Sequence, residues 1–392
     1  MKVGIATYHY SYNEGAILQA YSTTQVLNQI NGVTASIVDQ RYPAKVKTYG
    51  NPDTQRKAVL LDAIDNWLPL SDQHFREENE LSNVYKYINN TYDKLIIGSD
   101  VVWTLKYIRR FRSFIKGGIM PKQADPFFTP FPNLYWPHQD LHIPAYSYAA
   151  AIGNLEYDQI PKRDVEKIKT SLNRFEKISV RDERTRRFIE SVDSSLAHDV
   201  EIVPDPTFGL DLDKSMESDL KQNLEKWGVD FSKPICCFIA PDHPALSKFA
   251  TELHNQGYQT VSLSTKNTFG QIPLHDKPIS PLDWSNIFGL FDYCVTVRMH
   301  GAIFCLKNNI PFVAIDINET DKDNVSKTVD LMSRFNLIDY CIPQSELTFE
   351  RISSTFTELV NTRSEWLQNV NDILPGLKSR VIRYLSHIIS AG

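Results

Sequence analysis

The segment from Phe291 to Asp316, FDYCVTVRMHGAIFCLKNNIPFVAID, decides the fold of this chain. Its first part, Tyr293 to Val297, is a short apolar run rich in β-branched residues, which is typical of a buried parallel strand. Residues 302–307 are compatible with a helix, and residues 312–315 form a second apolar run. A strand, a helix and a second strand in close succession predict an α/β fold built on a parallel sheet.

The loop after the first of these strands carries Arg298 and His300, and Gly301 opens the segment that follows. In an open α/β sheet such a loop lies at the carboxyl edge, where ligands bind. A guanidinium and an imidazole beside the free N–H groups of a helix start favour a phosphate or a carboxylate. The alternative interpretation is a capped, solvated turn.

The composition describes an ordinary globular protein of two or three domains. The chain has 392 residues, 42% of them hydrophobic and 23% charged. A net charge of −5 argues against general nucleic-acid binding. The five cysteines show no metal-ligand spacing, and the vicinal pair at 236–237 is expected in the core. The odd cysteine count and a start without signal-peptide character predict a cytoplasmic protein, and no run of ~20 apolar residues predicts a membrane span.

A second strand–helix–strand pattern stands at the amino terminus. Strands are expected at 2–7 and 36–39, with a helix at 16–30 between them. Asn13 and Gly15 lie where the first strand passes into the helix, either as ligand contacts or as a turn and a cap. The Rossmann glycine fingerprint is absent, so a dinucleotide is not implied.

A third strand, from Asp93, ends at Asp100, and Trp103 follows three residues later. A carboxylate accepts hydrogen bonds from sugar hydroxyls, and an indole face packs on sugar C–H groups, so this pair suits sugar binding. The alternative is a helix cap at Ser99 or Asp100 with a core tryptophan.

Residues 104–140 alternate basic and aromatic side chains. Such a segment could contact lipid head groups or an anionic acceptor, or it could be a solvated helix and a packed loop. Arg181, at the end of a strand at 178–180, is a further candidate for an anion, or an ion-pair partner of Asp182 or Glu183.

The most probable domain boundary follows Pro204-Asp205-Pro206, where two prolines precede a polar run. We predict an N-terminal Rossmann-like domain at 1–210, a C-terminal one at 211–375, and a C-terminal helix at 376–392 that returns to the first domain. Residues 43–92 are expected to be mostly helical, and two separate helices are expected at 348–373 and 377–389.

Five pieces of the sequence together resemble the polysaccharide pyruvyl transferases. They recur in the family's order: residues 12–21 (YNEGAILQAY), 93–103 (DKLIIGSDVVW), 179–183 (SVRDE), 203–208 (VPDPTF) and 298–301 (RMHG). The resemblance implies two Rossmann-like domains facing a cleft, similar to GT-B glycosyltransferases. It also implies transfer of the pyruvyl (carboxyvinyl) unit of phosphoenolpyruvate to a sugar of a cell-surface polysaccharide or its precursor, giving a pyruvate ketal.

The resemblance also implies roles for individual residues. The donor would be bound by cations and a helix start, from Arg181, Arg298, His300, Gly301 and Lys322; among these, Lys322 lies outside the matching motifs. The acceptor would meet Asn13, Gly15, Asp100 and Trp103. His300 and Asp100 would be the catalytic acid and base. No metal is expected, and no cofactor beyond phosphoenolpyruvate as co-substrate.

The predicted partners are phosphoenolpyruvate and a free or lipid-linked saccharide, so the protein would work in the cytoplasm, with the inner face of the membrane as an alternative site. Two other functions stay open. One is a nucleotide-sugar glycosyltransferase on the same fold, which needs a nucleobase and ribose site in the C-terminal domain. The other is a non-catalytic glycan-binding relative, against which the joint presence of Asp100, Arg298 and His300 argues.

Overall fold

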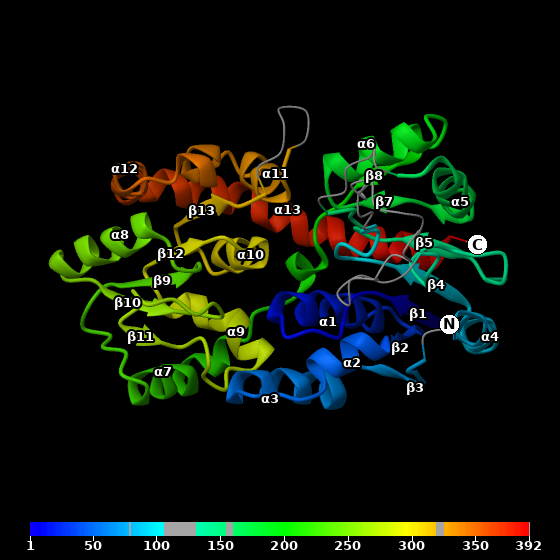
Figure 1. Cartoon of the computed structure of the whole chain (residues 1–392), viewed down its shortest axis with the longest axis horizontal. Helices are drawn as coiled ribbons and strands as arrows, with labels where there is room; N and C mark the ends of the chain where they lie inside the picture. The colour runs from blue at the N-terminus through cyan, green and yellow to red at the C-terminus, as the bar shows by residue number, and fades with distance from the viewer. Residues whose placement is uncertain (78–79, 106–130, 154–159, 319–324, 392) are drawn as a thin grey trace, which may run out of the picture.

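The computed structural model describes residues 1–77, 80–105, 131–153, 160–318 and 325–391, which form two α/β lobes (Figure 1). Each lobe contains a six-stranded parallel sheet within these described residues. We call the lobe that contains the N-terminus the first lobe and the other the second lobe.

The sheet of the first lobe has the order β3-β2-β1-β4-β5-β6, and every neighbouring pair is parallel. Its strands, in chain order, are β1 (Lys2–Ala6), β2 (Thr34–Gln40), β3 (Leu70–Phe75), β4 (Lys94–Ile97), β5 (Ala145–Ser147) and β6 (Phe175–Lys177). The helices of this lobe are α1 (Glu14–Asn28), α2 (Pro43–Tyr49), α3 (Gln55–Asp62), α4 (Leu81–Thr91), α5 (Lys162–Leu172) and α6 (Glu183–Val192). A small parallel pair, β7 (Ser179–Val180) and β8 (Glu201–Ile202), continues it.

The sheet of the second lobe repeats this strand order as β11-β10-β9-β12-β13-β14, again with parallel pairs. Its strands, in chain order, are β9 (Ile235–Ile239), β10 (Gln259–Ser262), β11 (Ile272–Pro273), β12 (Tyr293–Thr296), β13 (Phe312–Asp316) and β14 (Cys341–Pro343). The helices are α7 (Glu217–Lys226), α8 (Pro244–Asn255), α9 (Pro281–Ile287), α10 (Met299–Lys307), α11 (Lys327–Arg334), α12 (Phe349–Asn361) and α13 (Arg363–Ser390).

Three predicted elements differ from the structure. The segment 43–92, expected to be mostly helical, also contains β3, an edge strand that pairs with β2. Helix α10 begins at Met299, so His300 lies in its first turn instead of the loop before it. The two C-terminal helices, α12 and α13, are separated at Thr362 and not near Pro375, which lies inside α13.

Helix α13 continues through Pro375 because its packing is apolar on both sides of that residue. Trp366 and Val370 are fully buried before it, and Val381 and Leu385 are fully buried after it. A proline in a helix interior destabilises it by about 3 kcal/mol. Burying two or three large apolar side chains stabilises the fold by at least as much.

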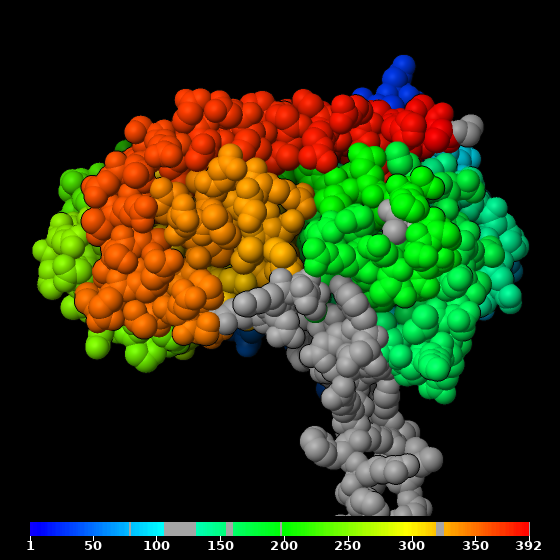
Figure 2. Space-filling model, turned by 90° about the horizontal axis from the view of Figure 1, so that it is seen from above, coloured from blue at the N-terminus to red at the C-terminus, as the bar shows by residue number. Residues whose placement is uncertain are grey.

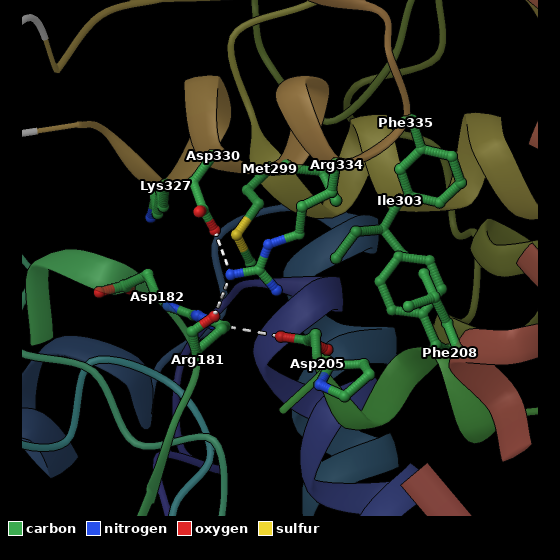
Figure 3. Close-up of a pocket in the computed structure, with 13 residues that line it drawn as sticks. Arg181, Asp182, Asp205, Phe208, Met299, Ile303, Lys327, Asp330, Arg334 and Phe335 are labelled. Carbon is green, nitrogen blue, oxygen red and sulfur yellow. Dashed lines mark hydrogen bonds and ion pairs between the residues drawn. The ribbon is translucent and has the colours of Figure 1, made fainter. Parts of the chain in front are cut away.

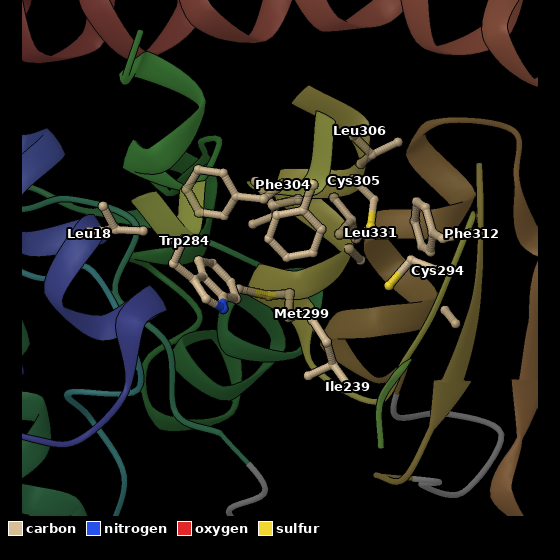
Figure 4. Close-up of a cluster of buried hydrophobic side chains, with 14 of the residues drawn as sticks. Leu18, Ile239, Trp284, Cys294, Met299, Phe304, Cys305, Leu306, Phe312 and Leu331 are labelled. Atoms are coloured by element: carbon tan, nitrogen blue, oxygen red, sulfur yellow. The ribbon is translucent and has the colours of Figure 1, made fainter. Parts of the chain in front are cut away.

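One apolar core extends across both lobes. Figure 4 shows Leu18, from α1 of the first lobe, beside Trp284, from α9 of the second, with Phe304 and Met299 of α10 next to them. Both members of the Cys236–Cys237 pair are fully buried, which confirms the core position predicted for them. The contact between α1 and α9 fixes the lobes against each other along an apolar surface.

Helix α13 runs along one side of the molecule and covers both lobes (Figure 2). It begins at the second lobe, where the Trp366 ring contacts Phe312, and ends at β4, where Lys94 Nζ donates to Ile388 O at 2.8 Å. We propose that the boundary between the two lobes lies at 210/211. The short helix η4 (Pro206–Gly209), which precedes it, packs on both α1 and α13 and leads from one sheet to the other.

Candidate active site

The two sheets present their carboxyl edges to the region between the lobes. In each sheet the chain order reverses between two central strands, β1 and β4 in the first lobe and β9 and β12 in the second. Ligands of open α/β sheets bind at such reversal points. The residues that follow these strands are therefore the first place to look for a site.

A cavity of about 310 Å³ opens at the carboxyl ends of β1, β2 and β4. This volume is in the range of ligand pockets. Its wall is mostly aromatic and polar, with two lysines, one carboxylate and two small aliphatic side chains: Thr7, Tyr8, His9, Tyr10, Ser11, Asn13, Ala16, Gln40, Tyr42, Lys45, Tyr49, Asp100, Val101, Tyr135 and Lys327. We call it the first-lobe cavity, although Lys327 comes from the second lobe.

Asp100 reaches this cavity from a backbone in the left-handed region, with φ +74°. Its Oδ1 accepts from the N–H of Val101 at 2.8 Å, and its side chain is 15% exposed. A non-glycine residue in this region carries strain, which the surrounding structure must hold. Asn13 is exposed on the same wall, where its Oδ1 caps α1 by accepting from the N–H groups of Gly15 and Ala16.

The carboxylate of Asp39 lies behind the cavity wall and binds four side chains there. It is fully buried and accepts from His9 Nε2 at 2.9 Å, Arg41 Nε at 2.7 Å, His74 Nδ1 at 2.8 Å and Arg76 Nη2 at 2.7 Å. Burial alone would raise the pKa of Asp39, but hydrogen bonds and charge from His9 and the two arginines hold it well below its usual range.

Arg181, Asp205 and His300 form a buried cluster between the lobes. Arg181 Nη1 lies 3.2 Å from Asp205 Oδ2 and 3.9 Å from Asp100 Oδ1. His300 Nε2 lies 3.6 Å from the same Asp205 oxygen, an ion-pair distance beyond a hydrogen bond. Burial by itself would raise the pKa of Asp205, yet His300 and Arg181 hold it far below its usual range.

This cluster retains donors that no described residue accepts from. Arg181 Nε and Nη2 and His300 Nε2 are buried and have no hydrogen-bond partner among the described residues. Buried polar atoms are usually paired, so the unpaired donors of the Arg181 guanidinium, with the imidazole nitrogen beside them, indicate a place for an anion. The ion pair of Arg181 with Asp182 or Glu183, considered above, is replaced by the pair with Asp205.

Two smaller cavities, of about 30 and 20 Å³, adjoin this cluster, and Arg181, Asp182 and Lys327 line both. Figure 3 shows the first of them, with Arg334 reaching from Asp330 to the carbonyl of Arg181. Lys327 lines all three cavities and so lies where they meet. Burial, and then the charge of Arg181, lower the pKa of Lys327.

Arg298 takes part in a second contact between the lobes, centred on Glu14 of α1. Its Nη1 lies 3.7 Å from Glu14 Oε2, and its Nη2 donates to the carbonyl of Ser264 at 3.3 Å. Glu14 Oε1 also accepts from Ser264 Oγ at 3.1 Å and from Arg56 Nε at 2.7 Å. Burial lowers the pKa of Arg298, and Glu14 partly restores it.

The two predicted glycines serve packing. A Cβ on Gly15 would lie 2.2 Å from Nδ1 of His300, so the ring occupies the space that a side chain would need. A Cβ on Gly301 would lie 2.5 Å from Thr296 Oγ1, so Gly301 lets α10 approach β12. Neither residue lines the three cavities, so close packing is the role that the structure gives them, and the ligand contacts predicted for Gly15 and Gly301 stay predictions.

Trp103 is a core residue, and its predicted contact with a sugar is wrong. The side chain is fully buried, donates from Nε1 to the carbonyl of Tyr135 at 2.9 Å, and stacks on Trp136 at 5.3 Å between ring centroids. Its ring face is therefore covered by protein, as the alternative interpretation expected.

Two predictions fall on positions outside the described residues. Lys322 lies in 319–324, and most of the basic-aromatic segment lies in 106–130. From the described end of that segment, Tyr135 lines the first-lobe cavity.

Sequence reasoning missed Glu14, Lys45, Asp205 and Lys327 as site residues. Glu14 and Asp205 lie inside matching motifs, which is a usable signal. Lys45 and Lys327 lie in no motif, and only the fold brings them to the cavity. Where the structure describes the chain, no three His, Cys, Asp or Glu side chains gather as metal ligands, and no helix is long and apolar enough to cross a membrane.

The sequence matches the family model described as polysaccharide pyruvyl transferase over residues 13–319. No curated protein matches it significantly. The matched span contains every residue of the clusters around Asp205 and Glu14, whereas the carboxyl end of β1 and Lys327 lie outside it.

Solved structures with the same architecture are enzymes that act on other substrates. UDP-GlcNAc 2-epimerase from Neisseria meningitidis, bound to UDP-GlcNAc, is 9% identical with a TM-score of 0.56 and covers 100% of both chains. A putative UDP-N-acetylglucosamine 2-epimerase from Listeria monocytogenes is 8% identical, with a TM-score of 0.55 over 100% of this chain and 97% of that one. The wall teichoic acid polymerase TagF is 10% identical, with a TM-score of 0.50 over 99% and 88%.

At such low identity these likenesses concern the fold alone. They confirm the predicted class, two Rossmann-like α/β lobes facing a cleft in the manner of GT-B glycosyltransferases.

Proposed function

The chain belongs to the polysaccharide pyruvyl transferase family, and on that premise we propose that it moves the pyruvyl unit of phosphoenolpyruvate onto a sugar of a cell-surface polysaccharide or its precursor, forming a pyruvate ketal. One observation carries the proposal beyond the family. Arg181 of the first lobe and His300 of the second converge on Asp205 with buried donors that no described residue uses.

The donor would bind at this cluster. Phosphoenolpyruvate carries a phosphate and a carboxylate, which suit a guanidinium and an imidazole. Lys327 would add a third cation from the neighbouring wall, and Arg298 a fourth from the contact with Glu14. Lys322 remains a proposed donor contact from outside the described residues.

The adjoining cavities of about 30 and 20 Å³ have room for little more than a water molecule. Donor binding at the cluster therefore requires the lobes to separate or the pair between Arg181 and Asp205 to break. If the pair breaks, the Arg181 nitrogen that now donates to Asp205 becomes available to the donor.

The acceptor would lie in the first-lobe cavity, with the hydroxyl that reacts directed to Asp100. Arg181 Nη1 lies 3.9 Å from Asp100 Oδ1, so a donor at the cluster and a hydroxyl at Asp100 would be close neighbours. Asn13, on the same wall, would contact the sugar at the rim.

The reaction would begin when His300 gives a proton to the methylene carbon of phosphoenolpyruvate, which makes C2 electrophilic. A sugar hydroxyl attacks C2 and loses its proton to Asp100. The C2–O bond to phosphate then breaks, and inorganic phosphate leaves. A second hydroxyl of the same sugar attacks C2, gives its proton back to His300 and closes the ketal, while the proton taken up by Asp100 leaves with the phosphate. One phosphoenolpyruvate and one diol thus give one ketal and one phosphate.

The setting would be the cytoplasm. All five cysteines are buried free thiols, which suits a reducing compartment. Peripheral contact with the membrane stays a proposal for the basic-aromatic segment.

The test is to incubate the full chain with phosphoenolpyruvate and a panel of mono- and oligosaccharides. We expect one acceptor to gain the mass of a pyruvate ketal and to release phosphate in equal amount. Parallel reactions with UDP-sugars in place of phosphoenolpyruvate should give no product. Transfer from a UDP-sugar without any use of phosphoenolpyruvate would reject the proposal in favour of a glycosyltransferase.

A further inference from the structure

The first-lobe cavity contains an ammonium group that has no carboxylate partner in the part of the chain that the structure describes. Lys45, on α2, points its Nζ over the ring of Tyr8, 4.2 Å from the centroid. No described carboxylate lies within ion-pair distance of this Nζ. Burial lowers the pKa of Lys45 to about 8, while the charge of Asp100 works in the opposite direction. At pH 7 the group is still mostly charged, so an anion in the cavity would be stabilised by it.

His9 lies on the same wall and is held within the lobe. Its Nε2 faces Asp39 Oδ1 at 2.9 Å, and its Nδ1 faces the carbonyl of Thr7 at 3.1 Å. Both ring nitrogens therefore have oxygen partners inside the protein, and His9 does not compete with Lys45 for a carboxylate or a phosphate.

The described groups behind the wall supply no carboxylate to Lys45. Asp39 is shared among His9, Arg41, His74 and Arg76, and Arg41 has a further partner in Asp65 at 2.6 Å. Among the described lining residues Asp100 is the one carboxylate, whereas Lys45 and Lys327 both bring an amine.

The remainder of the lining is suited to a sugar. Five tyrosines border the cavity: Tyr8, Tyr10, Tyr42, Tyr49 and Tyr135. Aromatic faces pack on the C–H surfaces of sugar rings. Burial raises the pKa of Tyr42 and of Tyr135, so their hydroxyls stay neutral and can donate to oxygen atoms.

We propose that the first-lobe cavity binds an acceptor saccharide that carries an anionic group, a phosphate or a carboxylate, and that Lys45 contacts this group. That this saccharide is the acceptor rests on the proposed function, but its binding to the cavity can be measured without turnover. Asp100, on the same wall, then faces a hydroxyl of the same sugar. Arg181 of the donor cluster lies next to it, with Nη1 3.9 Å from Asp100 Oδ1.

The experiment is calorimetric titration of the full chain with glucose 1-phosphate, glucose 6-phosphate, glucuronate and uncharged glucose, and separately with phosphoenolpyruvate. We expect a charged sugar to bind at least 10-fold more tightly than glucose. The phosphate and carboxylate arms identify which anion the cavity prefers. Lys45→Met should weaken the charged sugar by about 10- to 100-fold, the usual loss for a charge-assisted hydrogen bond.

Two control variants accompany Lys45→Met. Lys45→Arg keeps the charge and should retain most of the affinity. Lys47→Met removes an exposed lysine of the same helix α2 and should change nothing. Glucose binding should not respond to Lys45→Met, and neither should the affinity for phosphoenolpyruvate.

Three results would overturn the inference. They are the absence of saturable binding by all three charged sugars, an equal loss for glucose and for the charged sugars in Lys45→Met, and a matching loss of phosphoenolpyruvate binding in that variant. Failure of the wild type to use phosphoenolpyruvate at all would instead reject pyruvyl transfer and leave the sugar titrations interpretable.

Discussion

The two carboxyl edges of this protein come from sheets with the same strand order, yet one is open and the other is closed. At the edge of β1 and β4 the side chains surround a cavity of about 310 Å³. At the edge of β9 and β12 the space is taken by Arg298, which meets Glu14 of the other lobe, and by His300, which lies directly against Gly15.

This difference separates two ways of building a site. In the first lobe, Asp39 behind the wall pairs with His9, Arg41, His74 and Arg76, all of the same lobe. In the second lobe, Arg298 and His300 meet their carboxylates, Glu14 and Asp205, across the lobe boundary. The open edge should therefore be preorganised, whereas the closed edge should depend on how the lobes lie against each other. Four predictions test this comparison.

The largest effect is expected from His300→Ala at the closed edge. Loss of a charge-assisted contact to the donor costs about 1.5–3 kcal/mol, or roughly one to two orders of magnitude in donor use. Loss of the proton donor should lower kcat by a further ~100-fold or more. Phosphate release and the melting temperature are measured on one sample, with the exposed His142→Ala as the control. Unchanged turnover in a folded variant would end the assignment of the chemistry to α10.

Asp39→Ala should have the next largest effect, and on stability. The change leaves the guanidinium groups of Arg41 and Arg76, and the ring of His9, without their common acceptor. Breaking a buried ion pair in this way costs about 3–5 kcal/mol. Urea unfolding measures the change in free energy, and the exposed Asp53→Ala should unfold like the wild type. Equal stability of the two variants would show that the wall of the open edge is not preorganised by Asp39.

Gly15→Ala should disturb the closed edge without touching a donor group. The new Cβ would lie 2.2–2.6 Å from the His300 ring, so the ring must move. We expect kcat/KM for phosphoenolpyruvate to fall by about 10- to 100-fold, on the scale of the misplacement of a catalytic group. Gly376→Ala is the control, because a Cβ there meets nothing within 4 Å. If Gly15→Ala keeps full activity, the close contact between the lobes is not needed for catalysis.

The smallest effect concerns pH and Asp330, which pairs with Arg334 beside Arg181. Burial raises the pKa of Asp330 to about 6, with Arg334 opposing. A carboxyl whose folded pKa is raised stabilises the fold below its unfolded pKa of about 4, and this contribution is lost as pH rises through 6. The free energy of unfolding of the wild type, relative to Asp330→Asn, should fall between pH 4 and 6 by about 1–3 kcal/mol. A constant difference across this range would show that Asp330 stays ionised.

Some site residues could be recognised from the sequence because their position along a strand limits where they can go. Asp100, Arg181 and Arg298 all follow predicted strands, and a parallel sheet brings the ends of its strands to one edge. The family was recognised for the same reason, since five motifs in order span the residues that the family model matches.

Other residues could not be recognised, because their roles depend on what packs against them. Trp103 stands three residues after Asp100 in either interpretation, and only its stacking on Trp136 shows that it belongs to the core. Gly15 precedes a helix in many proteins for conformational reasons, whereas here it is the His300 ring, from a residue 285 positions later, that excludes a side chain.

By itself the sequence determined the α/β class, the two parallel sheets and the family, because strand and helix periodicity and short motifs are local properties of a chain. The tertiary structure alone decided that one carboxyl edge is open and the other closed, and that Lys45 and Lys327 face one cavity while Asp205 holds Arg181 and His300 together. These facts arise from contacts between segments far apart in the sequence, where burial and charge pairing, and not the order of residues, fix which side chains meet.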